Sequence, residues 1–358
     1  MEKARDKRHH FTLNGGVLNA LVAAALFGAS TPLAKLLSGE VPPVMLAGLL
    51  YLGSGIGLGA YWLLCRQRSI DPREASLRRR DVPCLAGTIV CGGVIAPVLL
   101  MVGLAMTPGT TSSLLLNLEG GMTAAVAWFV FRENFGRRVI LGVVAIVAGG
   151  IVLCWGGLPR WEAPWGPLAI AAACMAWAMD NNLTKKVSGS APVQIAAIKG
   201  LVAGTVNVSI GLGIHPNLPP IGVIAISGLV GLAGYGISLV LFVLALRRIG
   251  TARTGAYFSV GPFLGAVASI PLLGEPVTMP LLAAGGLMAL GVYLHMTEMH
   301  EHRHVHQSIV HNHGHVHDEH HLHQHLNTAA KPHAHDHVHD PTWHTHPHYP
   351  DLHHTHEH

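Results

Sequence analysis

The sequence predicts an all-α membrane protein that crosses the bilayer many times and ends in a polar, histidine-rich tail. Half of its 358 residues are hydrophobic, 12% are charged and 42 are glycine. One water-soluble core cannot bury so much apolar surface, and glycine is common where membrane helices approach closely. Twenty-three of the 27 histidines lie at or beyond His300, so the chain divides into an apolar body and a polar tail.

Ten stretches of the body are long and apolar enough to be transmembrane helices, since a helix needs about 20 mostly apolar residues to cross the hydrocarbon. The segments between them are polar, basic or rich in proline, such as Pro42-Pro43 and Pro219-Pro220. The basic residues 1–14 lead into the first stretch without a clear cleavage site, which argues against a signal peptide. The predicted spans are 15–37, 43–65, 82–104, 109–131, 138–156, 164–184, 192–213, 219–246, 252–273 and 277–297.

Lysine and arginine are distributed unevenly between the loops, and this bias predicts the orientation. The second loop carries six arginines between Arg66 and Arg80, and the fourth, sixth and eighth loops are also basic. The odd-numbered loops carry little positive charge beyond Lys35 and Arg160. We therefore expect a multi-pass protein of the inner (plasma) membrane with both termini in the cytoplasm.

Overlaying the two halves of the body reveals an internal repeat. A shift of 150 residues places Lys35 over Lys185. Near the ends of the halves the offset is shorter, and there Glu133 corresponds to Glu275. Each unit has an odd number of spans, so the second unit must enter the membrane inverted, as in many secondary carriers. The predicted domains are a basic N-terminus (1–14), two five-helix repeats (15–157 and 158–297) and a tail (298–358).

Three segments of the body resemble the EamA family of the drug/metabolite transporter superfamily. They are residues 27–35, Leu118-Glu119 followed about 14 residues later by Arg132-Glu133, and Pro262 followed by Gly274-Glu275. The resemblance covers about residues 15–297. It implies a ten-helix fold of two inverted five-helix EamA repeats around a central cavity, and transport of a small solute such as an amino acid, a nucleotide precursor or a sugar.

Glu119 is the carboxylate placed deepest in a predicted span, close to Asn117 in the fourth stretch. An ionised carboxylate in hydrocarbon costs about 2.5–3.5 kcal/mol on insertion scales, so it must face a cavity, be paired or be protonated. It serves either cation or proton binding or a structural hydrogen bond. The resembling family commonly has a proline after this glutamate, where this chain has Gly120 and Gly121. A glutamate here is therefore partly a family feature and does not identify one substrate.

Further polar residues lie in later spans. Asp180 and Asn181 stand in the inner third of the sixth span, and Asp180 either serves the substrate route, pairs with Lys199 or marks a helix end. Successive helical residues point about 100° apart, so these neighbours cannot face one site together. Tyr235 and Tyr257 either line the cavity or pack in the core.

The chain contains no nucleotide-binding or catalytic motif, such as a Walker lysine loop, HExxH or GxSxG. We therefore expect no enzyme and no required cofactor. We expect transport energy to come from an ion gradient, that of protons, with Glu119 as the best-placed titrating group.

The tail repeats the pattern His-x-His, which places alternate imidazoles on one side of an extended chain. Neutral imidazole suits nickel, cobalt, zinc and copper, and interspersed aspartates add oxygen ligands. With few apolar residues, the tail is expected to stay disordered without metal. The predicted ligands are His302, His304, His306, His311, His313, His315, His317, His333, His335, His337, His339, His344, His346 and His348.

Three functions fit these patterns. The first is a proton-coupled exporter of a divalent transition metal, with the tail collecting or sensing cytoplasmic ion. The second is an exporter of a small metabolite or amino acid whose tail buffers or senses metal. The third is a membrane-anchored metal store. The expected partners are the lipid bilayer and a small solute or metal ion, without nucleic acid, and a homodimer is possible.

Overall fold

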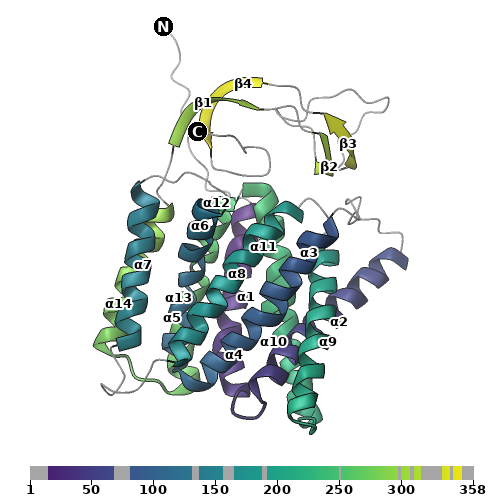
Figure 1. The fold of residues 1–358 in the computed structure, drawn as a ribbon, viewed down its shortest axis with the longest axis vertical. Helices are drawn as coiled ribbons and strands as arrows, with labels where there is room; N and C mark the ends of the chain where they lie inside the picture. Colours follow the sequence, from purple (N-terminus) through teal and green to yellow (C-terminus); the bar gives the residue numbers. More distant parts are fainter. Residues whose placement is uncertain are drawn as a thin grey trace.

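A computed structural model gives the fold of the chain as a helical bundle with paired strands beyond one end (Figure 1). The ten predicted spans each fall on helix. Within the described part of the chain, six helices are long and apolar enough to cross a membrane, and two further apolar helices are shorter. The structure describes residues 15–67, 81–130, 137–155, 165–187, 192–249, 251–296, 300–306, 310–315, 333–338 and 342–348.

The first half of the bundle contains α1 (Gly15–Leu37), α2 (Pro43–Gln67), α3 (Val82–Thr88), η2 (Ile89–Ile95), α4 (Ala96–Met106), α5 (Gly109–Leu115), α6 (Leu118–Phe129) and α7 (Arg137–Trp155). The second half contains α8 (Trp165–Val187), α9 (Pro192–Ile214), α10 (Ile221–Gly231), η3 (Leu232–Ile237), α11 (Ser238–Ile249), α12 (Thr251–Phe258), α13 (Gly261–Leu273) and α14 (Met279–Met296).

Helices of the two halves pack against one another throughout the bundle. At one edge α7 lies beside α14, and at the opposite edge α2 lies beside α9 (Figure 1). Between these edges α1 packs against α11 and α13, and α8 packs against α4 and α6. The centre of the bundle is therefore built from both halves of the chain.

The third span of each half contains a π-helical segment, η2 in the first and η3 in the second. After η2 the Ala96 N–H bonds to the Cys91 carbonyl, and after η3 the Ser238 N–H bonds to the Ala233 carbonyl, each five residues back. A π-turn inserts one residue into a helix, and such turns often occur at functional sites.

The fourth span of each half is interrupted. Between α5 and α6 the chain makes a tighter turn, in which Asn117 N–H bonds to the carbonyl of Leu114. Between α12 and α13 a similar turn bonds Val260 N–H to the Tyr257 carbonyl. Pro262 stands in the first turn of α13 and has no N–H to continue the preceding helix. Interrupted helices at corresponding places in two repeats are typical of carrier binding sites.

Four segments of the tail form strands, which differs from the predicted disorder. β1 (His300–His306) pairs with β4 (Thr342–His348), and β2 (Val310–His315) pairs with β3 (His333–Val338), both antiparallel. The physical reason is that strict alternation of two residue kinds is the period of a strand. The register sets His302 opposite His346, His304 opposite His344 and His313 opposite His335.

Candidate functional site

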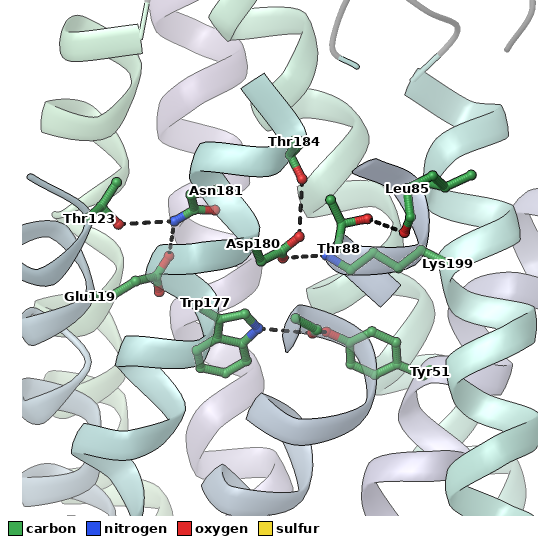
Figure 2. A network of polar contacts seen from close by, with 11 residues as sticks. Tyr51, Leu85, Thr88, Glu119, Thr123, Trp177, Asp180, Asn181, Thr184 and Lys199 are labelled. Carbon is green, nitrogen blue, oxygen red and sulfur yellow. Dashed lines mark hydrogen bonds and ion pairs between the residues drawn. The ribbon is translucent and has the colours of Figure 1, made fainter. Parts of the chain in front are cut away.

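The polar residues of α8 reach different neighbouring helices, as the rotation of about 100° per residue predicts. Asp180 forms a salt bridge with Lys199 of α9, and Thr184 donates a hydrogen bond of 3.1 Å to its other oxygen (Figure 2). Asp180 and Lys199 are each 4% exposed. Of the alternatives open for Asp180, the structure has the pair with Lys199.

Asn181, the next residue of α8, binds the predicted carboxylate of the fourth span. Its Nδ2 donates to Glu119 Oε1 at 2.8 Å and lies 3.4 Å from Thr123 Oγ1, one turn further along α6 (Figure 2). Among the described residues, Asn181 is the hydrogen-bond partner of the Glu119 carboxylate.

The π-segment η2 is held by side chains from three other helices. The Gly92 carbonyl accepts hydrogen bonds from Tyr51 Oη at 2.6 Å and from Trp177 Nε1 at 3.1 Å (Figure 2). The Gly93 carbonyl accepts one from Asn207 Nδ2 at 3.1 Å. A Cβ at Gly92 would overlap the Asp180 carboxylate, so glycine is required for this approach. The π-turn and the buried salt bridge are thus in direct contact.

Aromatic rings connect this polar group to the second half of the chain. Phe27 of α1 lies with its ring centroid 6.0 Å from those of Trp177 and Tyr235, and 5.3 Å from that of Phe258. Tyr235, on η3, is 5.4 Å from Tyr51. Both π-segments therefore contribute to one centre, lined by aromatic faces and by the carboxylate network.

The two interrupted spans meet close to Glu119. A Cβ added at Gly120 would lie 3.8 Å from Ser259 Oγ, which stands in the interruption between α12 and α13. Glu119 therefore lies beside the junction of the two halves, where an inverted-repeat carrier is expected to bind its substrate.

The structure brings together most of the predicted membrane residues. Glu119 contacts Asn181, and Asp180, the residue before Asn181 on α8, contacts Lys199 of α9. Asn117 is buried and donates to the Leu114 carbonyl of its own chain segment, so it stabilises the interruption instead. Tyr257 is half-buried on α12 and takes no part in this described network.

The sequence interpretation missed Tyr51, Trp177 and Thr184. Tyr51 and Trp177 carry polar atoms within apolar spans, where such atoms need a hydrogen-bond partner. The sequence therefore contained a signal that could have identified both residues. Which carbonyl would serve as that partner could not be read from the sequence, because Gly92 becomes an acceptor only through the π-turn.

No group of three or more His, Cys, Asp or Glu residues that could hold a metal ion occurs in the parts of the chain that the structure describes. The structure describes the backbone of most predicted tail histidines, which lie on β1–β4. His317 and His339 are outside the described residues. The side chains of the tail lie outside the described part as well, so the metal site stays a prediction.

Comparison with known proteins identifies the fold and the class. Residues 14–155 and 164–297 each match the EamA-like transporter family. The chain belongs to this family. Both EamA units fall on the membrane body, and the predictions of a membrane transporter and of no enzyme are confirmed.

Several EamA-like relatives are transporters by description. The chain is 29% identical over 294 residues to an uncharacterized transporter of Methanothermobacter thermautotrophicus, covering 78% of this chain and 85% of that one. It is 26% identical over 300 residues to a probable amino-acid metabolite efflux pump of Salmonella typhimurium, covering 77% and 93%. It is 25% identical over 266 residues to the uncharacterized inner membrane transporter YedA of Escherichia coli, covering 71% and 81%.

A solved crystal structure has the same fold as this EamA-like chain. The two superpose with a TM-score of 0.61 at 19% identity, covering 79% of this chain and 99% of the other. This likeness shows the fold alone. Transport across a membrane follows from the family match, and the cargo is a separate question.

Proposed function

We propose that this EamA-like carrier exports a small organic solute bearing an amine, in exchange for protons, and that Glu119 binds the proton and the amine in turn. The observation that carries the proposal is the Glu119 carboxylate beside the junction of the two interrupted spans, with Asn181 on Oε1. A carboxylate that alternates between a proton and a cation couples their movements, because the two compete for one site.

The surroundings of Glu119 favour an organic cation over a metal ion. Trp177 and Asn181 are four residues apart on α8 and so share a face, which places an aromatic ring one turn from the residue that binds Glu119. Aromatic faces attract ammonium groups, whereas nickel, cobalt and zinc select imidazole or thiolate ligands. The description of the Salmonella typhimurium relative as an amino-acid metabolite efflux pump supports the same substrate class.

The tail is proposed to bind divalent transition metal and to buffer or sense it on the cytoplasmic side. This is the second of the three functions that the sequence left open. A metal cargo stays a prediction, since the histidines that favour it lie in the tail and not in the membrane body.

The test compares wild type with Glu119→Gln in proteoliposomes. The amide can still accept the hydrogen bond from Asn181, but it neither titrates nor carries charge. The amount of the variant in the membrane should equal that of the wild type, and its proton-driven flux of labelled amino acids and amines should be lost. Nickel or zinc flux should be absent in both proteins. Glu40→Gln is the matched control, because Glu40 is exposed after α1.

Three results decide between the alternatives. Gradient-driven flux at the wild-type rate in Glu119→Gln would refute the coupling role of this carboxylate. Proton-driven nickel or zinc flux in the wild type, without amine flux, would establish the metal cargo and overturn the amine proposal. Flux of a substrate without an amine would reject the substrate class alone.

A further inference from the structure

A second carboxylate, Glu275, joins the two halves of the bundle far from Glu119 in the sequence. Its Oε1 accepts a hydrogen bond of 2.6 Å from the Gly109 N–H, and its Oε2 accepts one of 2.7 Å from the Thr110 N–H. Gly109 and Thr110 form the first turn of α5 in the first half, whereas Glu275 follows α13 in the second half. Both oxygens of one carboxylate thus bind the free N–H groups of a helix in the opposite repeat.

The local backbone on both sides prepares this contact. Gly274 has φ 63°, a left-handed conformation that favours glycine, and it ends α13 immediately before Glu275. Pro108 precedes α5 in an extended conformation, so the first N–H groups of α5 have no helical acceptor. A negative carboxylate is also favoured at the positive end of a helix.

The residues around the contact come from both halves. A Cβ on Gly109 would lie 3.1 Å from Ser269 Oγ of α13, so α5 and α13 are in close contact here. Lys35, at the end of α1, donates to the Leu104 carbonyl at the end of α4, and its ammonium interacts electrostatically with Glu275. Under the predicted orientation this end of the bundle faces away from the cytoplasm.

We propose that Glu275 is a latch that keeps this end of the carrier closed and releases α5 when the carrier opens to that side. Alternating access moves one repeat against the other around a fixed site. The seven residues of α5 span about 10 Å at 1.5 Å per residue, and the interruption that precedes Glu119 follows directly. Release of the first turn of α5 therefore changes the position of the segment that carries the central carboxylate.

The test measures the access of water to Ser112, which is fully buried one turn inside the latch. Ser112→Cys replaces one oxygen by the larger sulfur and is the smallest change that adds a reactive thiol. A membrane-impermeant maleimide is added outside cells, and labelling of residue 112 is followed by peptide mass spectrometry, so that the native cysteines can stay. We expect slow labelling with Glu275 present and at least tenfold faster labelling in Glu275→Gln, because the amide has one acceptor oxygen and its NH2 group cannot accept from the second N–H.

Two further variants keep the test decisive. Glu275→Asp retains the charge but is one carbon shorter, so it should label at an intermediate rate and serves if the amide variant fails to fold. Glu40→Gln removes an exposed carboxylate at the end of α1 and should label as the wild type does.

Unchanged labelling in both well-folded Glu275 variants would show that the carboxylate is only a fixed cap and would overturn the latch. Faster labelling of residue 112 only by reagent on the cytoplasmic side would also overturn the latch. The readout needs no substrate, so its failure is distinguishable from failure of the proposed function of Glu119.

Discussion

Asp180 and Lys199 are two buried residues of the bundle whose opposite charges compensate each other. Each is almost completely buried, and each has its opposite charge as a direct partner. The remaining Asp180 oxygen accepts a hydrogen bond from the Thr184 hydroxyl. A buried pair contributes little net stability over apolar residues, but removal of one partner leaves a buried charge without compensation.

We therefore expect Asp180→Asn to lower the free energy of unfolding by about 3–5 kcal/mol, because Lys199 keeps an unpaired charge. The double variant Asp180→Leu with Lys199→Met should be closer to wild type, since it removes both charges. Thermal stability of the purified carrier in detergent measures the difference. Equal destabilisation by the single and double variants would contradict this account of the pair.

At the scale of elements, the π-helical segment η2 is in direct contact with that charge pair. Its carbonyls receive hydrogen bonds from α2, α8 and α9, and its glycine allows the Asp180 carboxylate to approach the backbone. The corresponding η3 carries Tyr235 into the aromatic centre. The two π-segments thus bring polar and aromatic groups of both halves to one place.

Gly92→Ala should disrupt this arrangement, because its methyl group would displace the Asp180 carboxylate. Overpacking of this kind typically costs about 1–3 kcal/mol, and we expect transport to fall with it. Gly222→Ala on α10 is the control, since open space surrounds Gly222 and alanine favours a helix by about 0.5–1 kcal/mol. Wild-type stability and flux in Gly92→Ala would show that η2 tolerates a side chain.

At the scale of the whole molecule, the chain combines a membrane carrier with a tail of different physical character. The body is apolar and buries the Asp180–Lys199 charge pair, whereas the tail has few apolar residues and repeats histidine at alternate positions. The EamA match ends at residue 297, where the histidine-rich segment begins. We therefore expect the ten spans not to depend on the tail for burial.

The full-length protein should bind nickel or zinc at pH 7.5 and lose most of that binding at pH 5.5. Imidazole titrates near pH 6.5, and only its neutral form, present above that pH, ligates a metal. A chain truncated after Thr297 should fold without this binding. Equilibrium dialysis of both proteins at the two pH values is the measurement. Equal binding at both pH values would contradict histidine ligation, and binding by the truncated chain would place the site in the body.

Much of the fold was predictable because its signals are local. Spans follow from apolar length, and Pro262 lies at the interruption between α12 and α13, whereas Gly120-Gly121 lie inside α6 and do not mark the turn at Asn117. Glu119 was identifiable because a carboxylate in a span needs an explanation. Its partner Asn181 was a candidate only through its position beside Asp180, and Trp177 and Tyr51 were missed.

By itself the sequence determined the membrane class, the repeat, the family and the composition of the tail. Only the tertiary structure decided that Asp180 pairs with Lys199, that Asn181 binds Glu119 and that Glu275 caps α5. These contacts join residues 19, 62 and 166 positions apart. Hydropathy and periodicity indicate where one helix lies and which of its faces is apolar. These contacts depend instead on how the two inverted halves pack against each other. The same holds for the Gly92 carbonyl, which becomes an acceptor for Tyr51 and Trp177 only when the π-turn and three helices assemble.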